Sequence, residues 1–589
     1  MAGLWDRFRE WYYRGHPWYK LPLPLAAPRL IEIRDDLREH NLYDTEEPAM
    51  PKQAVPANLD PKLRFERTID GTWNDLTCPR MGAAGARFGR NFPLEQTRTD
   101  AANLLTPSPR DVSRELMTRT RFQPASILNL MAASWIQFMV HDWFFHKRTP
   151  NEHIEIPLKP DDPWPAKPMK VERTQPDPAP AGSKRPPAYV NLNSHWWDGS
   201  QVYGCDAATA AKLRTRVDGK LKIRGDGRLP VDPATGIDLV GFSDNFWLGL
   251  SMLHSLLVLE HNSICDLLRA QHPAWSDDAL YTKARLINGA LMAKIHTVEW
   301  TPAILPHPTT RLALPINWFG LAGEGLQDKF PGLDDNELLG GIVGSHADHH
   351  AAPYSLTEEF VSVYRMHALM PDEYTFRSIR TGQVLEQRTL PEITGRAGRP
   401  VFERISLADL FYSFGLSHPG ALRLHNYPTF LQQLRRDDGS LLDMASIDIL
   451  RDRERGLPRY CQFRRLLRMS PPKTFEELTD DAGWREQIRR VYGGDIEKVD
   501  LMVGLYAEPL PEGFGFSETA FRIFVLMASR RLKSDRFFTD DYKPEFYTQA
   551  GLDHIRNNGM RDVLMRHLPE LGPALQGVSN PFAPWRRVA

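Results

Sequence analysis

The sequence is poor in cysteine and has almost no net charge. Its four cysteines lie far apart and form no CxxC pair: Cys78, Cys205, Cys265 and Cys461. This spacing excludes a zinc ribbon or a dithiol redox motif and argues against a disulfide framework, so a reducing compartment is predicted. Lysine plus arginine (73) nearly balances aspartate plus glutamate (74), so no overall field attracts nucleic acid.

Long hydrophobic runs are also missing. No stretch of about 18 apolar residues could span a membrane, and the first residues show no apolar core with a small-residue cleavage site. A cytoplasmic protein is therefore predicted. The N-terminus does alternate aromatic and basic side chains: Trp5, Phe8, Trp11, Tyr12, Trp18 and Tyr19 with Arg7, Arg9, Arg14 and Lys20. Such a segment either lies peripherally in a membrane interface or packs on the protein's own surface.

Helical periodicity dominates the rest of the chain. Apolar residues recur three and four apart over 125–146, 244–270, 277–301, 355–370, 405–435 and 515–534, and alternating strand patterns are scarce. The stretch 157–187 contains ten prolines and few apolar residues, which predicts a surface excursion. The simplest architecture is an N-terminal arm (1–45) followed by one mainly α catalytic domain (46–589).

The stretch SILNLMAASWIQFMVHDWFFH (126–146) carries the first candidate site. Gln137 and His141 are four residues apart, so they share one face of a helix that is apolar almost all round. Burying two such polar groups is costly unless both are used. Asp142 is rotated by about 100° from His141 and points to a different site.

Asp142 has predicted partners in the loop NSHWWDGSQVYG (193–204). Side-chain and carbonyl oxygens alternate there, from Ser194, Trp196 (through its carbonyl), Asp198 and Ser200. Several oxygen ligands that include carboxylates suit Ca²⁺. The alternative is a polar turn before a helix.

The stretch SLTEEFVSVYRMHALMPDEY (355–374) carries the second candidate site. Tyr364 and His367 are three residues apart, which predicts one shared helix face. Histidine is a common proximal ligand of haem iron, and a tyrosine one turn away could be oxidised to a radical. Core packing is the alternative for this pair.

Four motifs occur in the order found in the animal haem peroxidase and cyclooxygenase superfamily. They are WIQFMVHDW, VLEHNSICDLL with HPAWSDDALYTKARLI, VYRMHALMPD and LRDRERGLPRYCQFRR, and the resemblance covers residues 120–540. Within that superfamily, VYRMH, IHTVEWT, MASRRLKSDRFF and the early WYKLPLPL resemble the fatty-acid α-dioxygenases. The resemblance implies a large, mainly α, single-domain fold with very little β and one haem b per chain.

The resemblance also implies roles for matching residues. His141 is expected as the distal histidine with Gln137 beside it, His367 as the proximal iron ligand and Tyr364 as the radical former. The remaining residues implied are His296, Thr301 and Arg536 for a fatty-acid carboxylate, and Asp142, Ser194, Trp196, Asp198 and Ser200 for calcium. An arginine can clamp a carboxylate through two hydrogen bonds, with Arg530 and Arg531 as competing cations on the same segment.

The implied reaction is α-oxygenation of a long-chain fatty acid. After activation by a peroxide, a tyrosyl radical abstracts the α-hydrogen and O₂ adds to that carbon. The 2-hydroperoxy acid formed can then lose CO₂ to give an aldehyde one carbon shorter. No nucleic acid takes part.

Two positions depart from related sequences, and three other functions compete. Cys461 stands in GLPRYC where related sequences usually have asparagine. Leu259 precedes Glu260, His261 and Asn262, where many peroxidases of the superfamily have arginine, which predicts weak peroxidase turnover. The alternatives are a peroxidase of small reductants and a non-catalytic haem or calcium scaffold at a membrane. A zinc hydrolase using HADHH (346–350) is disfavoured because no HExxH glutamate is present.

Overall fold

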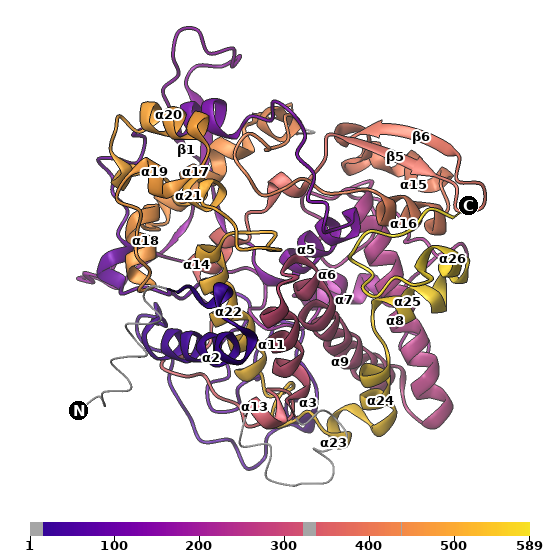
Figure 1. Ribbon diagram of the computed structural model, residues 1–589. Helices are drawn as coiled ribbons and strands as arrows, with labels where there is room; N and C mark the ends of the chain where they lie inside the picture. The colour runs from indigo at the N-terminus through magenta and orange to yellow at the C-terminus, as the bar shows by residue number, and fades with distance from the viewer. Residues whose placement is uncertain (1–15, 322–336, 437–438, 589) are drawn as a thin grey trace.

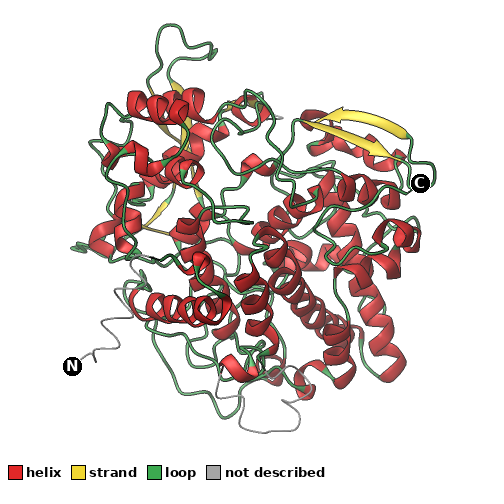
Figure 2. Cartoon of the chain, viewed as in Figure 1, coloured by secondary structure: helices red, strands yellow, loops and turns green. Residues whose placement is uncertain are grey.

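The computed structural model describes residues 16–321, 337–436 and 439–588. Helices are the main regular structure of the described residues, and the few strands lie at the periphery (Figures 1 and 2). The predicted mainly α fold with very little β is confirmed. No helix in the described ranges is both long and apolar enough to cross a membrane.

The α-helices in chain order are α2 (Leu23–His40), α3 (Pro61–Phe65), α4 (Pro109–Val112), α5 (Leu130–Trp143), α6 (Ser200–Tyr203), α7 (Ala207–Leu213), α8 (Leu248–Gln271), α9 (Asp277–Ile295), α10 (Thr301–Ile304), α11 (Pro308–Phe319), α13 (Glu337–Gly340), α14 (Glu358–Val363), α15 (Arg399–Arg404), α16 (Leu407–Leu416), α17 (Met444–Glu454), α18 (Tyr460–Leu466), α19 (Phe475–Leu478), α20 (Ala482–Val491), α21 (Leu501–Ala507), α22 (Glu518–Lys533), α23 (Pro544–Tyr547), α24 (Gln549–Asn557), α25 (Met560–His567) and α26 (Gly572–Leu575).

The strands are β1 (Arg148–Ile156), β2 (Met169–Thr174), β3 (Pro176–Asp177), β4 (Ala188–Tyr189), β5 (Glu373–Arg377), β6 (Val384–Thr389), β7 (Leu434–Arg435) and β8 (Leu441–Leu442). They pair two by two as antiparallel ribbons within the described part of the chain.

The helix that carries the first candidate site lies inside the core. α5 packs against α6, α8 and α16, and α8 in turn runs along α9 (Figure 1). Nearly every α5 residue is buried, apart from Gln137 and Val140. This explains why its sequence is apolar on all sides rather than on one stripe.

Two predicted helices differ from the continuous α-helix that their apolar pattern indicates. The stretch 405–435 is α-helical only through α16, because His418 precedes Pro419 and a residue before proline is disfavoured in the α region. The stretch 277–301 is α9 followed by a π-helical turn, His296–Trp300. Such wider turns often occur at functional sites.

The proline-rich stretch 157–187 contains more structure than predicted. Its residues Met169–Thr174 form β2, which pairs with β1 from Ile156↔Met169 to Arg148↔Thr174. Trp164, Met169 and Val171 pack in a small apolar cluster with Ile154 and Ile156. Prolines between the strands are compatible with this hairpin because they lie outside the hydrogen-bonded ladder.

The N-terminal arm joins the core through Trp18 and through the buried face of α2, which contains Leu30, Ile33 and Leu37. Trp18 is 2% exposed and packs on Phe514, Phe521 and His307. It is therefore not available as a membrane anchor. Residues 1–15, which carry most of the aromatic and basic pattern, lie outside the described ranges, so membrane contact by them stays a prediction.

Candidate functional site

A cavity of about 940 Å³ lies where the predicted haem residues converge. Gln137 and His141 line it from α5, and His367 lines it from the turn after α14. The volume is in the range of pockets that enclose a cofactor or a drug-sized ligand. Three residues from two distant segments are thus brought to one space.

The two α5 residues, Gln137 and His141, differ in their hydrogen bonding. Gln137 is fixed, because its Oε1 accepts a hydrogen bond from the Trp247 indole (2.8 Å) and its Nε2 donates to the Asn245 carbonyl (3.1 Å). Burial lowers the pKa of His141 to about 4, so its imidazole is neutral. Its Nδ1 is buried without a hydrogen-bond partner among the described residues. A neutral ring at a cavity wall can accept a proton.

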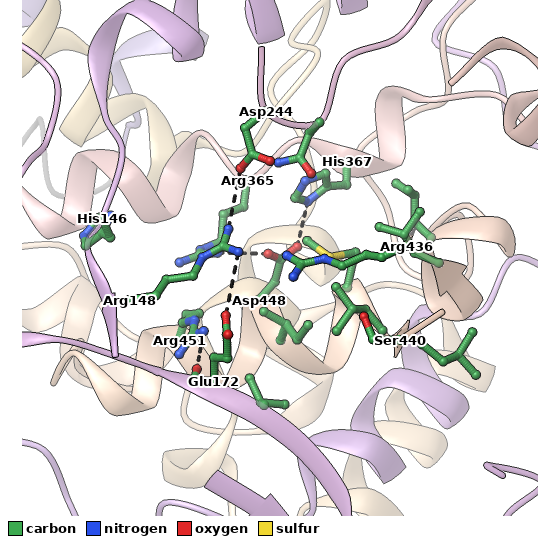
Figure 3. Close-up of a pocket in the computed structure, with 18 of the residues that line it drawn as sticks. His146, Arg148, Glu172, Asp244, Arg365, His367, Arg436, Ser440, Asp448 and Arg451 are labelled. Carbon is green, nitrogen blue, oxygen red and sulfur yellow. Dashed lines mark hydrogen bonds and ion pairs between the residues drawn. The ribbon is translucent and has the colours of Figure 1, made fainter. Parts of the chain in front are cut away.

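His367 is oriented by a buried carboxylate (Figure 3). Its Nδ1 lies 2.8 Å from Asp448 Oδ2, and Tyr427 and Arg365 each donate to the same carboxylate at 2.9 Å. Burial opposes ionisation, but these partners outweigh it and hold the pKa of Asp448 at about 2. The anion fixes the proton on Nδ1 and leaves the Nε2 lone pair to bind a metal.

Tyr364 and His367 do not share a helix face, contrary to the prediction. α14 ends at Val363, and His367 begins a separate 3₁₀ turn. The segment between α14 and the 3₁₀ turn stays non-helical because the Tyr506 hydroxyl donates to the Arg365 carbonyl (2.9 Å) and the Arg365 guanidinium binds Asp448. As a result the Tyr364 side chain can turn away from His367 toward a second cavity.

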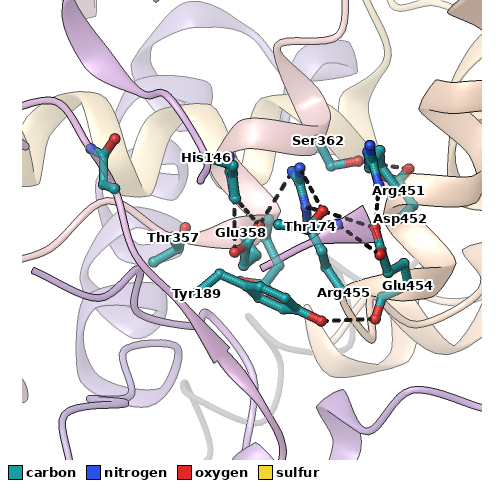
Figure 4. Close-up of polar contacts among 12 residues, drawn as sticks. His146, Thr174, Tyr189, Thr357, Glu358, Ser362, Arg451, Asp452, Glu454 and Arg455 are labelled. Carbon is teal, nitrogen blue, oxygen red and sulfur yellow. Dashed lines mark hydrogen bonds and ion pairs between the residues drawn. The ribbon is translucent and has the colours of Figure 1, made fainter. Parts of the chain in front are cut away.

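The start of α14 is anchored by a buried ionic network (Figure 4). His146 Nε2 lies 3.0 Å from both carboxylate oxygens of Glu358, and Arg455 lies 3.8 Å from the same group. One turn along the helix, the Ser362 hydroxyl donates to Asp452 (2.9 Å). These contacts tie α14 to α17 and to the chain after α5, and so fix the helix that ends at Tyr364.

The second cavity is small, about 20 Å³, and joins the predicted substrate residues to Tyr364. Tyr364, His296, Thr301 and Arg531 line it, and Tyr364 lines the larger cavity as well. Burial raises the pKa of Tyr364, so its phenol is protonated. The Thr301 hydroxyl donates to the His296 carbonyl (2.8 Å) across the π-helical turn. Entry of a larger molecule requires the lining side chains to move.

Arg531 is the cation of this cavity. Its guanidinium lies between the indoles of Trp143 and Trp197, 4.2 Å and 4.3 Å from the ring centroids. Its Nε and Nη2 have no hydrogen-bond partner within the described residues although both are buried. Burial lowers the pKa of Arg531. A buried cation with unused donors is suited to an anionic ligand.

Arg536, the predicted carboxylate clamp, does not reach either cavity. Its guanidinium pairs with Asp541 and donates to three backbone carbonyls, those of Leu63, Arg64 and Trp73. These bonds use the donors that a carboxylate would need. Arg536 therefore secures the early loop of the chain, and Arg531 is the arginine of this segment that lines the small cavity.

Helical spacing could have distinguished these arginines. Arg531 follows Phe524 and Ala528 at seven and three residues, so all three lie on the α22 face that lines the small cavity. Arg530 lies on another face, where it donates to the carbonyls of Ala352 (2.7 Å) and Pro353 (2.8 Å). Arg536 lies beyond the end of α22.

Asp142 points away from the haem cavity, as predicted, and meets the 193–204 loop. Its Oδ1 accepts from the Ser200 amide (2.5 Å) and hydroxyl (2.8 Å). Its Oδ2 and both carboxylate oxygens of Asp198 are buried without hydrogen-bond partners among the described residues. Burial raises the pKa of Asp142, and the charge of Asp198 adds to this. Arg285 lies 3.5 Å from Asp198.

Ser194 and Trp196 belong to the same loop. The Trp196 amide donates to Ser194 Oγ (3.2 Å), and the Trp196 indole is buried against Tyr354 (4.4 Å). In the described ranges no three His, Cys, Asp or Glu side chains surround one point. A cation here would therefore depend on two carboxylates together with hydroxyl and carbonyl oxygens, the ligand types that Ca²⁺ accepts.

The EHN segment lies away from the haem cavity. Leu259 does not line that cavity, and Glu260 points instead to the C-terminal helices, where His554 (2.7 Å), Arg566 (2.6 Å) and His567 (2.8 Å) contact it. Leu259 therefore does not contribute to the wall of the haem cavity, and weak peroxidase turnover stays a prediction.

The HADHH segment forms separate surface pairs. His346 lies 2.8 Å from Asp540, and His349 lies 2.8 Å from Asp75. The two histidines contact different carboxylates rather than one shared point, which gives no support to a zinc hydrolase.

Comparison of the whole chain with known protein families agrees with the haem site. The sequence pattern of the animal haem peroxidases matches residues 66–578, so the chain belongs to the animal haem peroxidase family, and membership implies a haem cofactor. The resemblance predicted from the ordered motifs is thereby confirmed.

Within that family the chain is an α-dioxygenase relative throughout its length. It is 40% identical to the α-dioxygenase PIOX of rice, Oryza sativa subsp. japonica, over 96% of this chain and 93% of that protein. It is also 40% identical to α-dioxygenase 2 of Arabidopsis thaliana, over 88% and 84% of the two chains. A crystal structure of a Tyr→Phe variant of the rice fatty acid α-dioxygenase with palmitic acid superposes with a TM-score of 0.91 at 38% identity, covering 99% of this chain and 97% of that one. The chain belongs to the α-dioxygenases.

Proposed function

We propose that the protein is a haem-dependent fatty-acid α-dioxygenase that converts a long-chain fatty acid and O₂ to the 2-hydroperoxy acid. The observation that carries this proposal is the position of Tyr364. Its side chain lines both the large cavity with His367 and the small cavity with Arg531. A radical on its oxygen would form next to the cation that holds the substrate carboxylate.

The cavity residues explain why the α-carbon would react. That carbon is one bond from the carboxyl group, so the oxidant and the carboxylate anchor must be close together. Arg531 would bind the carboxylate through its unused donors, and His296 would add a hydrogen bond from the π-helical turn. Thr301, which follows that turn, would add another when its hydroxyl rotates away from the His296 carbonyl. Positioning of this kind can contribute about 7–11 kcal/mol in favourable cases.

The large cavity fits one haem b. His367 would hold the iron through Nε2, and neutral His141 would take a proton from an activating peroxide. When bound, the haem supplies the one-electron oxidation that makes the Tyr364 phenol a radical. Gln137 would remain fixed by Trp247 and so keep the shape of the distal wall.

The chain then carries the remaining steps on Tyr364. The phenoxyl oxygen takes one hydrogen atom from the α-carbon, which restores the phenol and leaves a carbon radical. O₂ adds to that carbon to form a peroxyl radical. Return of the phenolic hydrogen atom gives the 2-hydroperoxy acid and restores the Tyr364 radical, so the oxygenation consumes only fatty acid and O₂.

Product analysis tests this proposal. Haem-loaded protein with palmitate, O₂ and a trace of peroxide should yield the 2-hydroperoxy acid and the aldehyde one carbon shorter, both detected by mass spectrometry. Methyl palmitate, which lacks the charge that Arg531 binds, should react much less. Unchanged palmitate together with rapid oxidation of a phenolic dye would instead indicate a peroxidase of small reductants.

We propose further that Asp142 and Asp198 hold Ca²⁺, with Ser194, Ser200 and the Trp196 carbonyl completing the ligand set. Three carboxylate oxygens of this pair are buried without hydrogen-bond partners among the described residues. Arg285, 3.5 Å from Asp198, compensates one of the two charges, and burying the other is costly unless a cation or a proton compensates it. The site adjoins His141 in sequence, so an ion here would stiffen the end of α5.

Calcium removal should lower thermal stability. A ligand at about 100 times its Kd stabilises the folded state by about 2.7 kcal/mol, so the unfolding midpoint should rise measurably when Ca²⁺ replaces a chelator. Asp198→Asn should remove this response. Asp206→Asn, at an exposed helix cap in the following turn, should keep it. Equal responses in the two variants would refute the assignment.

A further inference from the structure

Four indole rings enclose His296. Trp300 stacks on it at 4.6 Å between ring centroids, and Trp143 and Trp197 meet it edge-on at 5.2 Å and 5.3 Å. The fourth, Trp135, lies behind the imidazole and donates a hydrogen bond from Nε1 to His296 Nδ1 at 3.3 Å. His296 is 2% exposed, so this aromatic enclosure replaces its contact with water.

The Trp135 contact determines where the imidazole carries its proton. An indole N–H can only donate, so His296 Nδ1 must offer a lone pair and the ring proton must be on Nε2. Histidine tautomers usually have to be inferred from ambiguous hydrogen-bond networks. Here the partner of Nδ1 can only donate, so only the Nε2–H tautomer of the neutral ring is compatible with it. A cationic imidazole would place two N–H groups against each other.

The geometry points to Trp135 as a positioning residue for the substrate site. We infer that its indole holds His296 as the neutral Nε2–H tautomer, so that His296 presents a donor to the fatty-acid carboxylate in every turnover. This inference rests on the function proposed above. Trp135 lines neither cavity, so it would act only through His296.

The charges around the small cavity are consistent with this division of roles. Arg531 from α22 is the cation, Tyr364 at the end of α14 is a protonated phenol, and burial together with the Arg531 charge lowers the pKa of His296. The carboxylate would thus meet one positive group and one neutral donor. A second buried cation beside Arg531 would be destabilised by repulsion.

The placement also links the two cavities through one helix. Trp135 belongs to α5, which presents Gln137 and His141 to the larger cavity from another face. The same rigid segment would therefore orient the distal haem residues and the donor to the substrate. Sites supported by helices hold their geometry better than sites on loops.

Trp135→Phe tests the inference in the haem-loaded full-length protein. Without the indole donor, His296 can place its proton on either nitrogen, and part of the population loses its hydrogen bond to the carboxylate. The KM for palmitate should rise about tenfold, and kcat should stay close to the wild-type value because Tyr364 and Arg531 are unchanged.

Trp300→Phe provides a matched control for packing. Trp300 is equally buried and contacts the same imidazole, but its indole donates to the Ala132 carbonyl (2.9 Å) rather than to His296. If the KM effect arises from lost packing, the two variants should resemble each other. If it arises from the tautomer, Trp135→Phe should show the larger rise in KM at equal thermal stability.

A double-mutant cycle with His296→Gln completes the test. The glutamine amide can donate without a tautomer to fix, so Trp135→Phe should change KM by less than twofold in that background, where independent sites would give the full tenfold. A full additional effect would overturn the inference. Absence of any oxygenated product from the wild-type protein would instead refute the proposed function, so the two failures are distinguishable.

Discussion

Tyr364→Phe should reduce α-oxygenation of palmitate at least about a thousandfold, equivalent to about 4 kcal/mol in the barrier. Phenylalanine has no O–H bond to break, so no hydrogen-abstracting radical can form at this position. The ring contacts with Trp143 (5.2 Å) and Phe360 (4.6 Å) remain available to phenylalanine. Fold, haem binding and palmitate binding should therefore be retained, and oxygen uptake with product mass analysis measures the loss.

Tyr374→Phe is the matched control. Tyr374 is also buried, its hydroxyl has no partner among the described residues, and it lines neither cavity. Its loss should leave oxygenation within about twofold of wild type, since a surplus hydroxyl contributes little when nothing binds it. A Tyr364→Phe protein with full oxygenase activity and a normal haem spectrum would exclude the proposed mechanism.

Arg531→Met should lower kcat/KM for palmitate about a hundredfold or more. The change leaves a flexible apolar side chain between Trp143 and Trp197 but removes the charge that meets the carboxylate. Removing one partner of a buried ion pair costs about 3–5 kcal/mol because the other charge is left uncompensated. Most of the loss should appear in KM, and initial rates over a range of palmitate concentrations would show it.

Arg536 allows a direct comparison on the same segment. Arg536→Lys should lower thermal stability, because lysine cannot reproduce the contacts to three carbonyls and Asp541. Its KM for palmitate should stay close to wild type. If Arg536→Lys raised KM while Arg531→Met did not, the assignment of the carboxylate anchor would be reversed.

The haem side of the molecule could be predicted largely from sequence, for local reasons. Gln137 and His141 are four residues apart on one helix, and helical geometry alone brings them to one face. The rotation of Asp142 away from that face follows from the same geometry, and the structure shows it meeting Ser200. The ordered motifs added the family and with it the fold.

The residues that line the small cavity could not be predicted from sequence spacing, because tertiary contacts bring them together. Arg536 and Arg531 are five residues apart in a basic segment, and only the end of α22 decides which of them reaches the cavity. Asp448 is far from His367 in sequence, and Trp135 is far from His296. Each pair is joined only when separate helices pack together.

The break between Tyr364 and His367 shows the same division. Apolar spacing within 355–370 predicts a continuous helix. By itself, this protein's sequence determined the helices, the helix faces that are buried in the core and the histidines of the haem cavity. The tertiary structure decided where α14 ends, because Tyr506 and Asp448, from α21 and α17, bind Arg365 and hold the turn. Periodicity is a property of one segment, whereas a site is built from hydrogen bonds and charges contributed by several.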